Sequence, residues 1–187
     1  MRLTVGGRTP NLASCAEWSR APATSPPSGP AGAAIDHYMA EVQLRPGESP
    51  PAAFARVRVR LLAYDIFPSA FMRFAICPAG PTRVGATIVQ RIQCGPLALE
   101  AAVRVIEVWD RQESGGQEAG FRYVTLQGHP ECGIASFRVR VDEAGVVTVG
   151  IEARSRAGLL LTRIARPIAR VVQRLGSESA LRRLARS

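Results

Sequence analysis

The sequence predicts an α+β domain in which a curved antiparallel β-sheet wraps around a long C-terminal helix. Polar and apolar residues alternate in short segments between residues 84 and 153, as in strands that bury one face. Beyond them, apolar residues recur at helical spacing along residues 160–175. A sheet closed by such a helix is a helix-grip arrangement, whose concave face typically encloses an apolar cavity.

The length and composition suit one globular domain. The chain has 187 residues, of which 47% are hydrophobic, enough for a buried core. No run approaches the roughly 18–20 apolar residues that span a bilayer. The N-terminus also lacks the apolar core of a signal peptide. We therefore expect a cytoplasmic protein.

The first 35 residues are predicted to be a flexible segment outside the domain. They are rich in Ala, Pro, Ser and Gly and show little apolar periodicity. Such a stretch buries too little surface to offset the entropy that it loses on ordering. Residues 36–187 are then expected to form a single helix-grip domain that ends in an Arg-rich helical tail.

A helix is predicted after Ser49, although the pattern there is ambiguous. Ser49 followed by two prolines is a favourable helix start. Phe54, Val57 and Leu61 fit helical spacing, whereas the alternation in "ARVRVRL" fits a strand. The start signal decides in favour of the helix.

Five later segments are predicted to be strands of an antiparallel meander. The turn sequences QCGP, ESGGQEAG, GHPECG and DEAG separate them. The alternation is clearest where Phe137, Val139 and Val141 face one way and Arg138 and Arg140 the other. One face of the sheet is therefore expected to be buried. The five segments are residues 84–92, 99–109, 119–126, 134–141 and 146–153.

The end of the chain is predicted to be helical. Leu160, Ile168 and Leu175 lie along one face of this helix, and arginines lie along the other. Pro167 is expected to kink or divide the helix. Gly176 is expected to end it, with a last short helix in "ESALRRLAR".

The net charge of +9 lies in the C-terminal segment. Residues 154–187 hold 9 Arg against the single acid Glu178, whereas residues 1–153 hold 15 Arg against 14 acids. An Arg-rich helix is compatible with binding to nucleic acid or to an anionic membrane. Residues 154–187 contain no aromatic side chain for base stacking or membrane anchoring. We therefore expect no nucleic-acid partner and favour a solvated helix face over peripheral membrane contact.

The cysteines and histidines suggest neither a disulfide framework nor a metal site. The four cysteines form no CxxC pair, and in a reducing compartment we expect free thiols. The two histidines, His37 and His129, are far apart in the chain. No metal and no cofactor is therefore expected. The cysteines are Cys15, Cys77, Cys94 and Cys132.

Several motifs occur in an order that resembles a known family. The longest is "FRYVTLQGHPECG" at residues 121–133; shorter ones are FP at 67–68, VGA at 84–86, RVIEV at 104–108, SR at 155–156 and PIARVVQ at 167–173. Over roughly residues 50–185 the chain resembles the bacterial and plant family catalogued as domain of unknown function nineteen-ninety. That family is similar in outline to the START-like helix-grip superfamily. The resemblance implies this fold and no particular activity.

The GHPECG turn holds the best chemical candidate. His129 and Glu131 suit a general base oriented by a carboxylate, because histidine titrates near neutral pH. The alternative is structural: Gly128 and Gly133 supply unusual backbone angles, and His129 and Glu131 cap nearby amides. The structural role is favoured, and Cys132 as a nucleophile is favoured least.

Two strands carry candidates for the cavity wall. Arg104 shares a strand face with Val108, whereas Glu107 and Trp109 share the other, so either Arg104 or Glu107 is expected to point into the cavity. An arginine there binds a ligand carboxylate or phosphate, and a solvated or ion-paired arginine is the alternative. The candidate ligand-binding residues are Arg104, Glu107, Trp109, Phe121, Tyr123 and Thr125.

The favoured function is binding of a hydrophobic or amphipathic small molecule in the cavity between the sheet and the C-terminal helix. The alternative is a cofactor-free enzyme of cyclase, dehydratase or hydrolase type that uses His129 as acid or base in the same cavity. A third class is an interaction protein whose basic tail contacts a membrane or an acidic partner. Ser155 and Arg156 are expected to cap the C-terminal helix.

Overall fold

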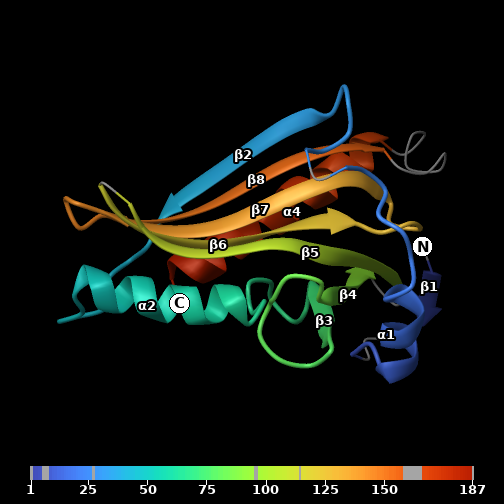
Figure 1. Cartoon of the computed structure of the whole chain (residues 1–187), viewed down its shortest axis with the longest axis horizontal. Helices are drawn as coiled ribbons and strands as arrows, with labels where there is room; N and C mark the ends of the chain where they lie inside the picture. Colours follow the sequence, from blue (N-terminus) through green and yellow to red (C-terminus); the bar gives the residue numbers. More distant parts are fainter. Residues whose placement is uncertain are drawn as a thin grey trace.

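The computed structural model describes residues 2–5, 9–26, 28–94, 97–113, 115–157 and 166–186 (Figure 1). The elements are β1 (Arg2–Val5), α1 (Leu12–Trp18), β2 (Ala34–Glu41), α2 (Pro50–Leu62), β3 (Met72–Cys77), β4 (Thr87–Cys94), β5 (Leu97–Glu113), β6 (Gly116–Thr125), β7 (Glu131–Asp142), β8 (Val147–Ala157) and α4 (Arg166–Ala185).

The strands form one curved antiparallel sheet, and two helices cover one of its faces. The strand order is β2-β8-β7-β6-β5-β4-β3, and β1 pairs with β5 outside this path. Helix α2 contacts β6, β7 and β8, while α4 contacts β2, β8 and α2. In Figure 1, α2 runs below the sheet and α4 behind it. The face that these helices cover is called the inner face, and the opposite one the outer face. This confirms the predicted α+β helix-grip fold.

The predicted helix after Ser49 is confirmed as α2. Ser49 adopts an extended backbone at the N-cap and Pro50 opens the first turn, although the Ser49 side chain makes no capping hydrogen bond. Phe54, Val57 and Leu61 are buried on one side of this helix. Burial at a spacing of three and four residues explains why helical packing prevails over the local strand-like alternation.

All five predicted strands are present, as β4 to β8, and three further strands were missed. β1, β2 and β3 lie outside the predicted meander. β5 continues to Glu113 and β8 to Ala157, beyond the predicted ends. Ser155 and Arg156 therefore lie in β8, paired with Gly133 and Cys132, and the prediction that they cap the C-terminal helix is wrong.

The predicted end of the C-terminal helix at Gly176 is wrong. α4, described from Arg166, continues through Gly176 to Ala185. The expected kink or division at Pro167 stays a prediction, because residues 158–165, before it, lie outside the described ranges. A Cβ on Gly176 would lie 3.0 Å from Cζ of Phe71, so the glycine lets the helix approach that ring. Leu184 is buried beyond it, which favours continuation of the helix. The side chains of residues 166–175, and residues 160–164 altogether, lie outside what the structure describes.

The basic end of α4 is held by acidic side chains. Arg183 contacts Asp65 at 2.8 Å, and Arg60 contacts the same carboxylate at 2.7 Å. Burial opposes ionisation of Asp65, but the hydrogen bonds from these arginines prevail and hold its pKa below the usual value. Arg182 lies 3.7 Å from Glu178. No helix among the described residues is long and apolar enough to cross a membrane.

Part of the N-terminal segment, helix α1, packs against the outer face. Trp18 of α1 is buried beside Val89, Ala102 and Leu126, in a second and smaller core. Its indole N–H donates to the carboxylate of the buried Glu100 at 3.1 Å. These contacts supply the burial that the composition of residues 1–35 did not suggest. The mobility of this segment, and its separation from residues 36–187, stay predictions.

A disulfide between Cys15 and Cys77 joins α1 to β3. The prediction of free thiols is therefore wrong for these two residues, since 62 positions of chain separate them and sequence spacing does not reveal their contact. Cys132 is a free, buried thiol. Disulfides persist mainly in oxidising compartments, so this bond lends no support to a cytoplasmic location. That location stays a prediction.

Candidate functional site

Three uncharged polar side chains meet inside the inner face. The amide of Gln90 donates to the phenol oxygen of Tyr64 at 2.5 Å, and the Tyr123 side chain lies beside both, close enough for the three to influence one another electrostatically. Tyr64 follows α2, Gln90 belongs to β4 and Tyr123 to β6. We call these residues the inner polar trio. Buried polar groups need partners, and here Gln90 and Tyr64 satisfy each other.

Tyr64 occupies a backbone conformation that side chains rarely adopt. Its φ is +58°, and no other non-glycine residue in the described part of the chain has a positive φ. The side chain is fully buried, and its ring meets Phe74 edge-on at 5.1 Å between centroids. Strained residues persist where the surrounding packing holds them, and they cluster at functional sites.

Aromatic rings surround the inner polar trio. Phe121 stacks on Phe137 with 5.2 Å between ring centroids, and Tyr123 lies 5.6 Å from Phe137. Phe67 and Phe71 pack against the same core but are only partly buried. The trio is therefore a small polar island in an apolar region, next to aromatic side chains that keep some exposure.

Both phenols of the trio are neutral at physiological pH. Burial, followed by the nearby Tyr123, raises the pKa of Tyr64 well above its ordinary value. Burial, followed by the negative charge of Glu131, raises the pKa of Tyr123. The inner polar trio thus offers neutral donors and acceptors and no ionised group.

The His129 ring is fixed by the backbone of the GHPECG turn. Nδ1 of His129 lies 3.0 Å from the Glu131 backbone nitrogen and 3.1 Å from the Glu131 carbonyl oxygen, so it accepts from the N–H or donates to the carbonyl according to the ring's tautomer. Burial lowers the pKa of His129 to about 4, against a partly compensating backbone hydrogen bond with Glu131. His129 is therefore neutral at pH 7 and a weak base.

The Glu131 contact to His129 is made by backbone atoms. The general-base hypothesis requires a carboxylate that orients the imidazole. The geometry shows instead a contact with the backbone nitrogen of Glu131. Gly128 has a φ of +92°, as the predicted turn requires. Gly133 instead permits close approach of strands, because a Cβ there would lie 2.3 Å from the carbonyl oxygen of Arg154. The geometry supports the structural role, and catalysis by His129 and Glu131 stays a prediction.

Thr125 uses its hydroxyl to join three segments. It accepts from the Gly133 N–H at 2.9 Å and donates toward the Gly133 carbonyl at 3.2 Å. Its backbone carbonyl accepts from the N–H of Thr24 at 2.9 Å. The thiol of Cys132 donates to the carbonyl of Thr24 at 3.0 Å. These contacts fasten the N-terminal segment beside the GHPECG turn.

A bulge in β5 turns two predicted ligand-binding residues, Glu107 and Trp109, to the outer face, where Arg104 already lies. The pairing with β6 shifts between Val105 and Glu107, so the alternation of β5 changes there. Val103 and Val105 point into the inner core before the bulge, and Val108 does so after it. Arg104, Glu107 and Trp109 therefore all lie on the outer face.

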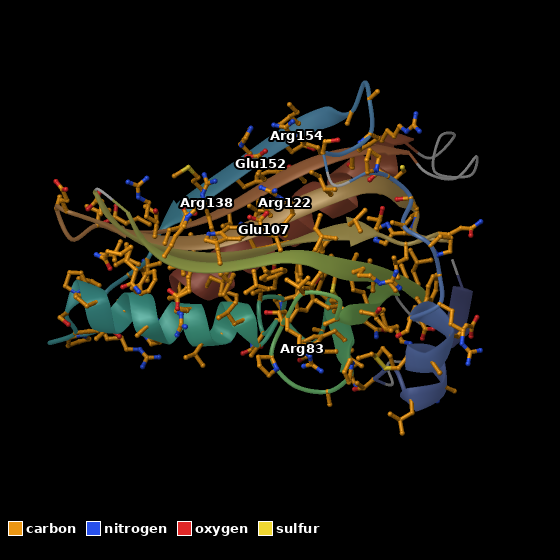
Figure 2. The ribbon with its side chains drawn as sticks, in the orientation of Figure 1. Arg83, Glu107, Arg122, Arg138, Glu152 and Arg154 are labelled. Carbon is orange, nitrogen blue, oxygen red and sulfur yellow. A yellow bond between two sulfur atoms is a disulfide. The ribbon has the colours of Figure 1, made fainter. Side chains whose placement is uncertain are left out.

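Each of these outer-face residues has a partner in the fold. Arg104 donates to the carbonyl of Ser19 at 2.7 Å, beside the end of α1. Glu107 contacts Arg122 at 2.8 Å, and Trp109 donates to Glu118 at 2.8 Å. Figure 2 shows Glu107 and Arg122 over the strands, away from α2. The expectation that either Arg104 or Glu107 points into the cavity is thus corrected, and a ligand role for the three stays a prediction.

Sequence reasoning missed Tyr64 and Gln90. Tyr64 lies in none of the motifs, and Gln90 is one residue of the predicted strand at 84–92. The available signal was a polar residue, Gln90, on the strand face that it shares with the apolar Ile88 and Ile92. Within the described ranges, no three side chains of His, Cys, Asp or Glu come close enough to hold a metal ion.

Solved structures of similar shape share little sequence with the chain. The NMR solution structure of KanY protein (ms6282) is 12% identical, with a TM-score of 0.49, and the match covers 82% of this chain and 96% of that one. The crystal structure of Ara h 8.0201 is 11% identical, with a TM-score of 0.47 and coverage of 82% and 98%. Major latex-like protein 151 from Panax ginseng is 14% identical, with a TM-score of 0.40 and coverage of 75% and 92%.

No curated protein matches the chain in sequence. The family model described as Domain of unknown function (DUF1990) matches residues 18–183. This range begins at the end of α1, well before the start of the resemblance seen in the motifs, and it contains the inner polar trio and the GHPECG turn. The chain therefore belongs to the family of the Domain of unknown function (DUF1990).

Proposed function

We propose that this chain binds an amphipathic small molecule at the inner face, between the sheet and the C-terminal helix. The observation that carries the proposal is the inner polar trio of Tyr64, Gln90 and Tyr123 within an aromatic surround. Small-molecule sites are typically apolar and contain a few convergent polar groups that orient the ligand. The trio and its neighbouring rings have this composition.

The aromatic side chains next to the trio supply the apolar wall of the proposed site. Phe67 and Phe71 lie 6.2 Å apart by ring centroid, and Phe67 lies 6.4 Å from Phe137. Phe67, Phe71, Phe74 and Tyr123 are only partly buried, in contrast to Phe121. Covering their remaining exposed surface with an apolar ligand is favourable by about 25 cal/mol per Å².

The protonation of the trio defines the polar part of the ligand. Tyr64 and Tyr123 remain neutral because burial raises the pKa of both phenols. A neutral hydroxyl donates to a carbonyl, ether or hydroxyl oxygen without requiring a charged partner. We therefore expect an uncharged polar group on the ligand, attached to an apolar body.

Native mass spectrometry of the purified protein tests the proposal directly. A co-purified small molecule, identified after denaturation, is the expected result. Titration with the uncharged apolar dye Nile red, followed by its fluorescence, gives an independent measure of the same site. Tyr123→Phe removes only a hydroxyl and should weaken dye or ligand binding about 2–10-fold, as expected for one neutral hydrogen bond.

Trp109→Phe is the matched control, because Trp109 is an aromatic residue of the neighbouring strand on the outer face. This variant should bind the dye as the parent does. The proposal is overturned if no small molecule co-purifies and dye binding does not saturate. Equal loss of binding in the Tyr123 and Trp109 variants would also overturn it, since the site would then not lie on the inner face.

A further inference from the structure

Strand β2 forms an open edge of the sheet. It pairs with β8 over all of Ala34–Glu41 without a shift in register, and in the part of the chain that the structure describes no strand pairs with its other side. Figure 1 shows β2 as the outermost strand at the upper edge. An uncovered strand edge presents unpaired backbone groups and is a template for pairing with another strand.

The direction of the backbone groups of β2 follows from one hydrogen bond. The N–H of Val42 donates to the carbonyl of Val147 at 2.8 Å, so Val42 points toward β8. Residues of an antiparallel strand alternate between the two neighbours. The N–H and C=O groups of Ile35, His37 and Met39 therefore point to the open edge. Gln43 fits this alternation, because its N–H points away from β8 and donates to Ala185 of α4 at 2.7 Å.

The side chains of these same residues lie on the outer face and include two large apolar groups. Ile35 is 51% exposed and Met39 is 64% exposed, with the exposed His37 between them. β2 contains no proline, lysine or arginine, the residues that commonly block pairing at strand edges. Backbone donors, backbone acceptors and apolar surface thus coincide on one edge.

We propose that β2 pairs with β2 of a second copy of this chain, antiparallel and two-fold symmetric, with His37 opposite His37 of the second copy. A two-fold contact joins the same surface of both copies, so the strand must complement itself. Centred on His37, the register places Ile35 opposite Met39 of the second copy, and Met39 opposite Ile35. All three pairs are of the hydrogen-bonded kind, because their backbone groups point to the open edge.

Neighbouring registers leave the apolar side chains opposite polar ones. Centring the pair on Asp36 places Ile35 opposite His37, and centring it on Tyr38 places Ile35 opposite Glu41. Cross-strand apolar pairs stabilise a sheet more than such mixed pairs do. The sequence of β2 thus selects the register centred on His37. Because an edge contact buries less than the roughly 1,600 Å² of a standard interface, we expect a weak, concentration-dependent dimer.

Disulfide trapping tests this register. In a hydrogen-bonded antiparallel pair the two Cα atoms lie about 5.5 Å apart, within the range of roughly 4.4–6.8 Å that a disulfide spans. The variant His37→Cys should therefore form a covalent dimer on mild oxidation, seen by non-reducing electrophoresis. Glu41→Cys, exposed on the same strand, is the matched control and should stay monomeric, because the two Glu41 positions are far apart in this register. Equal trapping of both variants, or of neither, overturns the proposal.

Sedimentation velocity over a range of concentrations tests the association without new cysteines. The parent protein should shift toward a dimer at high concentration, and Met39→Arg should weaken the dimer at least tenfold because it removes an apolar contact. Leu12→Arg is the control, since Leu12 is 87% exposed on α1, away from β2. A parent that stays monomeric throughout, or a Leu12 variant that loses the dimer as fully as the Met39 variant, overturns the proposal.

Discussion

The inner and outer faces of the sheet are built from alternate residues of the same strands, yet they differ in what holds them. The inner face is closed by aromatic rings around a neutral polar trio, with Phe121 fully buried. The outer face carries charged side chains in rows across the strands. Alternation along each strand thus separates an apolar surface from one whose charged side chains form ion pairs with one another.

One such row shows how the outer face is satisfied. Glu107 contacts Arg122 at 2.8 Å, and Arg122 donates to Ser136 at 2.9 Å. In the same row, Glu152 lies 3.7 Å from His37 and, along its own strand, 3.3 Å from Arg154. Figure 2 shows the labelled charged residues of this face gathered over the upper strands. These pairs are exposed and contribute little stability individually.

Where α1 covers it, the outer face gains a small core of its own. Glu100 is buried there and accepts from Trp18, Ser14 and Arg91. Burial opposes its ionisation, but the hydrogen bonds from Trp18 and Arg91 prevail and lower its pKa. The disulfide between Cys15 and Cys77 closes this region. The second core therefore combines little apolar area with a covalent link and a paired buried charge.

The comparison of the two faces is tested most strongly by removing one ring from each. Phe121→Ala should lower the free energy of unfolding by about 3–5 kcal/mol, because it leaves a cavity beside Phe137. Trp109→Ala, half-buried over Gly120, should cost about 1–2 kcal/mol. Urea unfolding measures both. Equal losses would contradict the distinction between a mostly buried inner face and a more solvated outer face.

The second core is tested by opening its covalent link. Replacing both Cys15 and Cys77 with serine should lower the free energy of unfolding by about 2–4 kcal/mol, since the unfolded chain loses a long closed loop. Urea unfolding of the oxidised parent and of the double variant gives the difference. Treatment with a reducing agent should destabilise the parent by a similar amount and leave the variant unaffected. A parent insensitive to reduction would show that the link contributes nothing.

The GHPECG turn, at the border of the two faces, should make stability depend on pH. The pKa of His129 is about 4 in the folded chain and about 6.5 when unfolded. Between pH 4 and 6.5 the unfolded chain therefore binds more protons than the folded chain does. The stability that neutral His129 contributes is fully present above pH 6.5 and is lost as the pH falls through 4.

The expected loss for His129 over that window is about 2–3 kcal/mol, measured by urea unfolding at several pH values. His129→Asn should flatten the slope, because its amide oxygen can accept the Glu131 N–H but does not titrate. His37→Asn is the matched control and should keep the slope. Retention of the slope in the His129 variant would assign it to other groups.

The smallest effect is expected for the ion pairs of the outer face. Glu107→Gln should change the free energy of unfolding by about 0–1 kcal/mol, because Glu107 and Arg122 are 45% and 39% exposed. Thermal unfolding at low and at high salt measures the contribution, which should shrink as salt screens the pair. A salt-insensitive loss of several kcal/mol would show that this row contributes as much to the free energy of unfolding as the inner face does.

Much of the fold was predictable because it rests on local patterns. The start of α2 followed from Ser49 and Pro50, and strands β4 to β8 followed from alternation between turn sequences. β2 also alternates, but its first two residues belong to the segment predicted to be flexible, and no strand was predicted there. The continuation of α4 through Gly176 was missed because the ring that the glycine approaches, Phe71, is distant in sequence.

The candidate site was only partly predictable. Phe121 and Tyr123 were placed on a buried strand face by alternation, and the structure puts both in or against the inner core. The same alternation put Arg104 on one face and Glu107 and Trp109 on the other. The bulge between Val105 and Glu107 interrupts it and turns Glu107 and Trp109 to the face of Arg104. A bulge depends on how two strands pair, and a single strand read alone gives no sign of it.

By itself, the sequence determined the class of fold, because hydrophobic periodicity and turn residues act over a few positions of chain. Only the tertiary structure decided which side chains meet. The contact of Tyr64 with Gln90 and Tyr123, the disulfide of Cys15 with Cys77, and the outward turn of Glu107 join or orient segments far apart in sequence. Such contacts depend on strand register and on packing of distant elements, and the spacing of residues along the chain encodes neither.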